Sequence, residues 1–281
     1  MSTENTKKRG YRSYSVSIIG AGWLGLPLAQ HLKQTGCALT LSSRAKDKVT
    51  KLTQSGWHAC QFELGQSVPA ELAQNDIAII NIAAGRKQLA PEEYSEKVLK
   101  LVQELISQNV QYILFVSTTS VYGSQSGKIT EASPVKPNTN SGTAHVQIEE
   151  HLRQHLSGRT TILRLAGLVG DERHPVKFLS GKVELTNPDH AVNLVHRKDV
   201  INAITAIIEN QVWGKTLHLC SLEHPSRQEY YQWAAKQLGL VLPEFVTSDG
   251  AAGKLIDASN TIETLGINLE YASPFDMLSQ N

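Results

Sequence analysis

Cysteine is scarce in this chain of 281 residues, and its three positions are far apart. Cys37, Cys60 and Cys220 form an odd set with no C-x-x-C pair. Such a set indicates reduced thiols and argues against a disulfide framework and against a cysteine-based zinc site. The ten histidines are scattered along the chain, and we predict no metal site.

The chain also lacks a strong charge imbalance and a long apolar run. Its 27 lysines and arginines nearly balance its 26 aspartates and glutamates, which argues against a nucleic-acid partner. No apolar run approaches the roughly 20 residues that a membrane span requires, so we expect no membrane partner. Residues 1–13 are polar and basic, and no apolar segment typical of a secretory signal follows them. We expect these residues to form a mobile tail on a cytoplasmic protein.

The glycine pattern G-x-G-x-x-G stands between a strand-like and a helix-like segment. A β-branched apolar run, residues 15–19, leads into the three glycines, and residues 26–33 continue with helical spacing. In this context Gly20 permits a tight turn, Gly22 lets the backbone approach a pyrophosphate, and Gly25 lets helix and strand pack closely. The pattern is typical of a dinucleotide-binding site at the start of a helix.

The end of the second expected strand, residues 38–42, indicates which dinucleotide is bound. Ser43 and Arg44 follow this strand, where an NAD site usually carries Asp or Glu to hold the ribose 2′-hydroxyl. A carboxylate would repel a 2′-phosphate, whereas a hydroxyl and a guanidinium can bind one. The pair favours NADP, with NAD as the alternative if Arg44 stacks on the adenine or faces solvent.

Strands and helices alternate along most of the chain. Residues 76–84 are nearly continuously apolar, as expected for a strand that helices cover on both faces of a parallel sheet. The alternation predicts an α/β fold of Rossmann type, a doubly wound parallel sheet with a small C-terminal substrate-binding portion. Further strands are expected at 57–62, 112–117, 161–165 and 215–219, and helices at 46–55, 91–107, 141–156, 198–210 and 227–238.

The regular alternation loosens beyond Gly167, which predicts a division of the chain. We expect a dinucleotide-binding Rossmann domain of residues 14–166 and 191–221. The smaller substrate-binding portion is expected to consist of residues 167–190 and 222–281. The last forty residues are expected to be irregular, with a turn around Gly266.

Five short motifs occur in an order that is specific, although each motif alone is weak. They are G-x-G-x-x-G at Gly20–Gly25, Asn81–Ala84 with its Ala-Ala pair, Val121–Gly123, Arg164–Gly170 and Asn193–Val200. With these motifs the chain resembles the extended short-chain dehydrogenase/reductases, the NAD(P)-dependent epimerase/dehydratase group, over nearly its whole length. Within that group it is most similar to the atypical YeeZ-like branch.

The resemblance implies an NAD(P) cofactor, a small-molecule substrate and a set of site residues. The Ser or Thr that contacts substrate in the family lies four residues before the Tyr of V-Y-G, which is Thr118 here. Thr119 and Ser120 stand where sugar dehydratases carry Asp and Glu, which argues against a dehydratase of that kind. Tyr122 itself is expected to be structural. The predicted cofactor-binding residues are Gly20, Gly22, Trp23, Leu24, Gly25, Ser43, Arg44, Leu64, Ala83, Ala84, Gly85, Ser117, His145 and Leu165.

The chain departs from the family at the proton donor. The family's Y-x-x-x-K, aligned here on Pro137 and Glu149, has Ser141 at the Tyr position and His145 at the Lys position. A Ser hydroxyl lacks the acidity of a phenol, and a His is charged only part of the time at neutral pH. The predicted catalytic residues are therefore Thr118, Ser141 and His145. Three roles stay open for His145: holding the ribose, weak acid–base catalysis or packing.

Two further features have both a functional and a structural interpretation. Trp23 can shield the pyrophosphate or line a pocket, or it can be a packed surface aromatic. Arg173, His174 and Lys177 can form an anion site for a phosphorylated or carboxylated substrate, or they can form a solvated basic loop.

Two functions of different classes follow from these observations. The first is an oxidoreductase or epimerase acting on a small molecule, with sugars and sugar nucleotides as candidate substrates, in which Ser141 and His145 replace Tyr and Lys. The second is a non-catalytic dinucleotide-binding sensor or scaffold. A homodimer is left open as the assembly, and the fold alone does not choose between the two functions.

Overall fold

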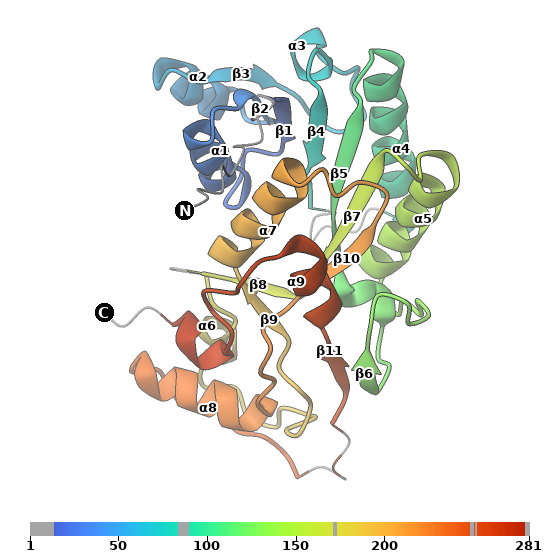
Figure 1. Cartoon of the computed structure of the whole chain (residues 1–281). Helices are drawn as coiled ribbons and strands as arrows, with labels where there is room; N and C mark the ends of the chain where they lie inside the picture. Colours follow the sequence, from blue (N-terminus) through green and yellow to red (C-terminus); the bar gives the residue numbers. More distant parts are fainter. Residues whose placement is uncertain (1–13, 84–89, 171–172, 248–249, 251, 279–281) are drawn as a thin grey trace, which may run out of the picture.

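The fold is built on one seven-stranded parallel sheet with helices on both faces (Figure 1). The computed structural model describes residues 14–83, 90–170, 173–247, 250 and 252–278. Neighbouring strands of the sheet are all parallel, in the order β10-β7-β5-β4-β1-β2-β3. The strands are β1 (Ser15–Ile19), β2 (Ala38–Ser43), β3 (His58–Gln61), β4 (Ile77–Ile80), β5 (Tyr112–Thr118), β7 (Thr160–Leu165) and β10 (Thr216–Leu219).

The chain leaves the middle of the sheet in two directions. From β1 it passes outward through β2 to the edge strand β3, and it then returns to add β4, β5, β7 and β10 on the other side. The strand order reverses between β1 and β4. Open α/β sheets bind ligands at such a point, outside the carboxyl ends of the strands. The carboxyl ends of β1, β2, β4 and β5 therefore frame the candidate site.

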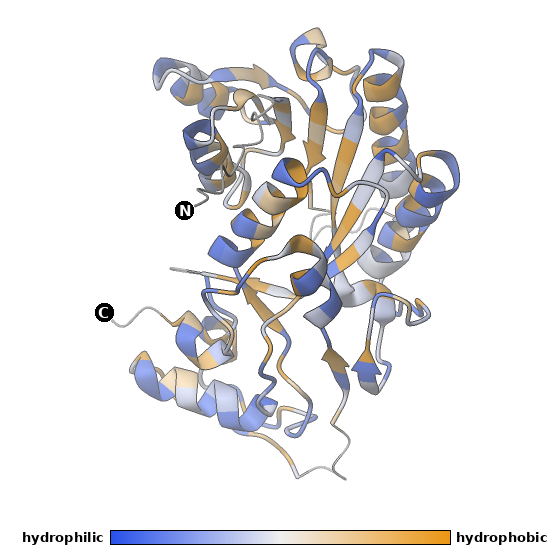
Figure 2. Ribbon diagram, in the orientation of Figure 1, coloured by the Kyte–Doolittle hydropathy of each residue, from blue (hydrophilic) through white to orange (hydrophobic). Residues whose placement is uncertain are grey.

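Two apolar clusters cover the two faces of the sheet. One contains side chains of α1, α2, α7 and α9, and the other contains side chains of α3, α4 and α5. In Figure 2 the central strands are mostly hydrophobic, and the outer faces of the surrounding helices are largely hydrophilic. The helices are α1 (Gly25–Gln34), α2 (Lys46–Gln54), α3 (Ala70–Ala73), α4 (Pro91–Ser107), α5 (Asn140–His155), α7 (Arg197–Glu209) and α9 (Ser259–Leu265).

Smaller elements lie outside the sheet. A third apolar cluster packs α8 and η2 against two short parallel strands, β8 and β9, and a second small pair joins β6 to β11. That residues 167–190 and 222–281 act as a separate substrate-binding portion stays a prediction. These elements are β6 (Gly127–Ile129), β8 (Gly167–Val169), α6 (Val176–Leu179), β9 (Leu194–His196), α8 (Arg227–Gln237), β11 (Lys254–Ile256), η1 (Thr119–Tyr122) and η2 (Pro274–Met277).

The structure confirms the Rossmann-type sheet and most expected elements. Helices α4 and α5 occupy the two segments expected to be helical, 91–107 and 141–156. The strand expected over 76–84 is shorter: β4 ends at Ile80, and the Ile82 carbonyl accepts a hydrogen bond from the Tyr94 side chain of α4 instead of from a strand. The last forty residues, expected to be irregular, contain α9 and β11.

Helix α9 ends at the expected turn, where Gly266 adopts a left-handed conformation with φ +63°. Across the described part of the chain, no helix combines the length and the apolar character that crossing a bilayer requires.

Candidate functional site

The three glycines of the G-x-G-x-x-G loop differ in what a side chain at each position would contact. A Cβ atom added at Gly20, where φ is +108°, would lie 2.4 Å from the Asn81 carbonyl oxygen, and one added at Gly25 would lie 2.2 Å from the Gly20 carbonyl oxygen. These two glycines let the loop pack against β4 and against itself. Gly22 is different, because a Cβ there would meet nothing closer than the Gly20 oxygen at 3.9 Å. The backbone at Gly22 therefore faces open space that a ligand can occupy.

The start of α1 leaves donors available beside Gly22. The backbone N–H groups of Trp23 and Leu24 have no hydrogen-bond acceptor among the described residues. Leu24 caps the helix without a side-chain hydrogen bond, and the first turn carries no acidic residue. Free N–H groups and the positive end of a helix dipole favour an anion, so this loop fits the pyrophosphate of a dinucleotide.

The carboxyl end of β2 packs against the glycine loop and then turns outward. The buried Ser42 hydroxyl accepts a hydrogen bond from the Gly20 N–H (3.2 Å), and the Ser43 hydroxyl accepts one from the Ala45 N–H (3.3 Å). Arg44 is exposed, and within the described residues its guanidinium has neither an ion pair nor a hydrogen bond. A phosphate next to the loop would find a cation that no carboxylate of the described residues neutralises.

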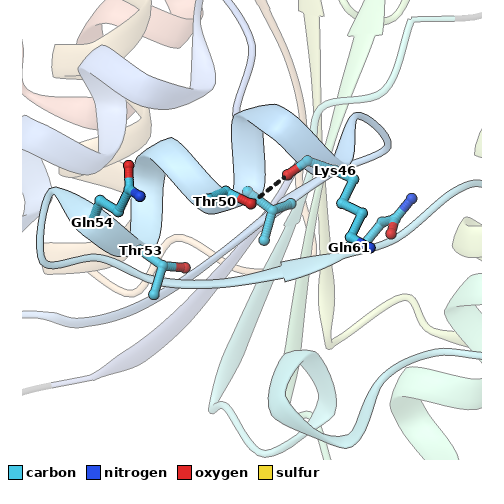
Figure 3. A pocket seen from close by; sticks show the side chains of 6 residues that line it. Lys46, Thr50, Thr53, Gln54 and Gln61 are labelled. Atoms are coloured by element: carbon cyan, nitrogen blue, oxygen red, sulfur yellow. Dashed lines mark hydrogen bonds between the residues drawn. The ribbon is translucent and has the colours of Figure 1, made fainter.

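A cavity of about 410 Å³ runs along α2 on the edge of the sheet (Figure 3). Lys46 and Gln61 lie at the end of this cavity where β2 and β3 terminate, and Gln54 lies at the other end. The Gln61 amide donates to the Arg44 carbonyl (3.0 Å), which ties β3 to the segment after β2. The cavity thus adjoins the residues predicted to bind the adenosine end of the cofactor.

The neighbouring strand ends carry the next predicted cofactor contacts. Ala83, after β4, is exposed, and Ala84 and Gly85 lie outside the described residues. Leu64 follows β3 and packs against the apolar cluster under α4, and Leu165 is buried at the end of β7. Their predicted contacts with a cofactor stay predictions.

Ser117 and Thr118, at the end of β5, point their hydroxyls in different directions. The Ser117 hydroxyl donates to the buried Glu149 carboxylate (2.6 Å) and so faces the interior. The Thr118 hydroxyl accepts from the Ser120 N–H (3.1 Å) and donates to the Ser120 hydroxyl (3.1 Å). Thr118 therefore caps the short helix η1 and lies half-buried at the strand end.

Helix α5 places Ser141 and His145 one turn apart. The ring nitrogen Nδ1 of His145 lies 2.7 Å from the Ser141 carbonyl oxygen, and a carbonyl can only accept, so Nδ1 carries the proton. The other nitrogen, Nε2, is left with a lone pair. The ring is buried between Phe115 and Tyr94, with centroids 5.6 and 5.8 Å away. Burial lowers the pKa of His145, so the imidazole is neutral at pH 7.

A buried ion pair anchors α5 to the sheet one turn after His145. Arg164 of β7 donates to both oxygens of Glu149, at 2.6–3.1 Å, and both side chains are almost fully buried. The same guanidinium donates to the Tyr122 hydroxyl (2.7 Å), which also contacts Nδ1 of His218 (3.2 Å). Tyr122 is thus structural, as expected, and burial raises its pKa.

The three basic residues after β8 do not gather into one group. His174 is buried, its Nδ1 accepts from the Val176 N–H (3.2 Å), and its Nε2 lies 2.8 Å from the Tyr230 hydroxyl. Burial lowers the pKa of His174 to about 4, so this side chain is a neutral part of the core. Arg173 and Lys177 are exposed. Arg173 lies over the half-buried ring of Trp23, 5.1 Å from its centroid.

One histidine pair has a spacing that suits metal binding. His151 and His155 follow H-x-x-x-H on α5, and their rings stack at 4.2 Å. Nδ1 of His155 lies 3.0 Å from the His151 carbonyl oxygen. Among the residues that the structure describes, no group of three or more potential ligands could hold a metal ion.

Sequence reasoning missed the partners that fix the site. Tyr94 of α4 donates to the Ile82 carbonyl (2.6 Å) and packs on His145, but a Tyr in an amphipathic helix carries no signal of this role. Glu149 entered the sequence analysis only as a position on which the family's Y-x-x-x-K motif is aligned. Its spacing of four residues from His145 was the available signal, since it places both side chains on one face of α5.

Comparisons with known proteins agree with this geometry. A sequence profile of the family described as NAD(P)H-binding matches residues 20–211. The protein YeeZ of Escherichia coli K12 is 37% identical over 271 residues, which cover 93% of this chain and 98% of YeeZ.

Solved structures share the fold at low sequence identity. A putative NAD-dependent epimerase/dehydratase from Methylobacillus flagellatus has a TM-score of 0.77 at 21% identity, covering 95% of this chain and 96% of that one. The UDP-glucose-4-epimerase of Stenotrophomonas maltophila, solved with bound NAD, has a TM-score of 0.76 at 20% identity, covering 94% and 95%. The chain therefore belongs to the NAD(P)H-binding family, is a homologue of YeeZ, and has the fold of epimerase/dehydratase-type short-chain dehydrogenases/reductases.

Proposed function

We propose that this protein is an NADP-dependent oxidoreductase or epimerase that acts on a small hydroxyl- or carbonyl-bearing substrate. The observation that carries the proposal is the open space at Gly22, next to unpaired N–H groups and at the carboxyl ends of the parallel strands. Helix α5 brings Ser141 and His145 to the same end of the sheet. Two similar folds have been solved with NAD, one with UDP-glucose, so a sugar nucleotide is the first substrate class to test.

The bound dinucleotide would supply or accept the hydride, and the chain would orient it. The N–H groups at the start of α1 would hold the pyrophosphate, and the end of β2 would hold the adenosine ribose. His145 can accept a hydrogen bond at Nε2 from a ribose hydroxyl. A neutral imidazole does not provide the positive charge that lowers the pKa of a nearby phenol, and Ser141 has no such phenol to offer. We therefore expect proton transfer to be slow.

Substrate selection belongs to the residues around Thr118. Its hydroxyl is half-buried at the end of β5 and bonds only to Ser120 within the described residues, so both hydroxyls can rotate toward a ligand. We assign contact with the substrate hydroxyl to Thr118. The segments 167–190 and 222–281 would cover the substrate from the other side.

The preference for NADP is tested by calorimetry with both dinucleotides. A charge-assisted contact contributes about 1.5–3 kcal/mol, so NADP should bind at least about tenfold more tightly than NAD. Arg44→Ala should remove most of the difference, and Ser43→Asp should favour NAD. Lys51→Ala removes the same charge from the far end of α2 and should change neither affinity. Equal wild-type affinities for the two dinucleotides would contradict the preference.

A non-catalytic redox sensor is the second candidate function, and one observation favours it. Two phenols that adjoin the proposed site, Tyr94 beside His145 and Tyr122 in η1, are both buried, and burial raises the pKa of each. Neither is an acid that works near pH 7. An assay of NADPH oxidation with a panel of carbonyl compounds, including sugar nucleotides, distinguishes the two functions. Turnover that Thr118→Ala abolishes supports the enzyme, whereas tight NADPH binding without turnover supports the sensor.

A further inference from the structure

Two arginines from distant segments lie against the tryptophan of the glycine loop. Arg197, the first residue of α7, has its guanidinium carbon 4.5 Å from the Trp23 ring centroid, and it donates to the Trp23 carbonyl at 3.3 Å. The guanidinium carbon of Arg173 is 5.1 Å from the same centroid. Both distances are within the range of a cation–π contact. A tryptophan inside a phosphate-binding loop thus gathers two positive charges.

The backbone around β8 explains how the two arginines meet. Two reciprocal backbone hydrogen bonds, 2.9 and 3.1 Å long, join Gly170 and Arg173. A Cβ atom at Gly170 would lie 3.1 Å from Nε2 of His196 and 3.2 Å from Cβ of Arg197. The glycine therefore lets the backbone approach the start of α7 closely. These backbone contacts position Arg173 near the start of α7.

The charge on Arg173 is not neutralised within the described residues. Its guanidinium makes no ion pair or hydrogen bond there, and only the indole ring holds it. The adjacent N–H groups of Trp23 and Leu24 have no acceptor among the described residues either. Donors of the glycine loop and of Arg173 thus converge at this loop.

We propose that Arg173 binds the diphosphate bridge of the dinucleotide, with Trp23 as its platform. This inference rests on the proposed function, since it takes the glycine loop as the cofactor site. A guanidinium fits phosphate oxygens with two parallel hydrogen bonds and stacks flat on an aromatic ring at the same time. The segment after β8 would then help to retain the cofactor from outside the glycine loop.

Calorimetry with two ligands tests the proposed contact between Arg173 and the diphosphate bridge, called the diphosphate clamp below. NADP contains the diphosphate bridge, and adenosine 2′-monophosphate lacks both phosphates of the bridge while keeping the 2′-phosphate. Arg173→Gln should weaken NADP binding about tenfold, as expected for a lost charge-assisted hydrogen bond, and leave the binding of the monophosphate unaffected. Arg173→Lys keeps the charge without the planar fork and should give an intermediate loss. Lys182→Gln removes an equal charge from an exposed position nine residues later in the chain and should change neither affinity.

A double-mutant cycle tests the platform. Trp23→Leu should weaken NADP binding as much as Arg173→Gln does. The double variant should lose little more affinity than either single variant, because both changes disrupt the same Arg173–Trp23 contact. Unchanged NADP affinity in Arg173→Gln would overturn the clamp, and so would an equal loss for both ligands or an effect on substrate KM alone. A wild-type chain that bound neither ligand would overturn the proposed function as well.

Discussion

His145 shows how burial decides what one side chain can do. Its position suggested three roles, and the sequence could not choose between them because the choice depends on the surroundings of the ring. Phe115 and Tyr94 remove water from the imidazole, and the Ser141 carbonyl fixes the proton on Nδ1. Together they favour a neutral hydrogen-bond acceptor over a charged substitute for lysine.

If His145 acts as a neutral hydrogen-bond acceptor, replacing it should weaken NADPH binding without changing the pH dependence of that binding. Its pKa is lowered from the ordinary value of 6.5, so the neutral form of the wild-type ring predominates from pH 6.5 to 8. His145→Ala should weaken NADPH binding roughly tenfold, the loss of about one hydrogen bond, by the same factor across this range. His155→Ala, an exposed change on the same helix, is the control for fluorescence titrations. A wild-type affinity or rate that titrates between pH 6.5 and 8, and stops doing so in His145→Ala, would indicate an acid–base role instead.

At the scale of elements, the long helices and central strands could be predicted and the short connections could not. Helix α4 begins at Pro91 and runs to Ser107, as its apolar face predicts. Strand β11 has three residues and pairs only with β6, more than 120 positions earlier in the chain. So short an element has no periodicity of its own, and its pairing partner decides whether it is a strand.

Helix α5 is the element whose position the site depends on, and a buried charge pair holds it. Replacing one partner of such a pair leaves the other charge buried and uncompensated, which costs about 3–5 kcal/mol. Glu149→Gln should therefore lower the free energy of unfolding by about that amount, because it leaves Arg164 without its carboxylate. Urea denaturation followed by circular dichroism measures the change.

Glu150→Gln is the matched control for this prediction. Glu150 is the exposed neighbour of Glu149 on the same helix, and its substitution should change stability by less than about 0.5 kcal/mol. If the two variants had equal stability, the buried pair would not be what anchors α5.

At the scale of the whole molecule, several neutral histidines link stability to pH. Burial lowers the pKa of His145, His174, His218 and His224 from 6.5. The unfolded chain therefore binds more protons below pH 6.5 than the folded chain does, so stability falls as the pH drops. Asp199 acts with the opposite sign, because burial raises its pKa, but the histidines outnumber it.

The expected result is a free energy of unfolding that is nearly constant between pH 7 and 8 and declines from pH 6.5 toward 4. His174, with a folded pKa of about 4, should account for up to about 3 kcal/mol of this decline. Urea titrations at a series of pH values should show a shallower slope for His174→Gln than for the wild type. Stability that rises on acidification would contradict this account.

Contacts between residues far apart in the sequence could not be predicted at this scale. The order of motifs is enough to predict a Rossmann-type fold, since each motif is local. The chain of contacts from Glu149 through Arg164 and Tyr122 to His218 spans 96 positions of the sequence, from 122 to 218, and joins α5, η1, β7 and β10. No local pattern encodes such contacts, because they exist only after the sheet has assembled.

The central claim, that the glycine loop binds a dinucleotide, is tested most directly at Gly22. Among the described residues beyond its chain neighbours, a Cβ atom at Gly22 would meet only the Gly20 oxygen, at 3.9 Å, so Gly22→Val should abolish NADP binding in calorimetry while the melting temperature of the unliganded protein stays nearly unchanged. Gly25→Ala is the contrasting variant, since its Cβ would lie 2.2 Å from the Gly20 oxygen and should destabilise the fold. A folded Gly22→Val protein that bound NADP with wild-type affinity would contradict the account.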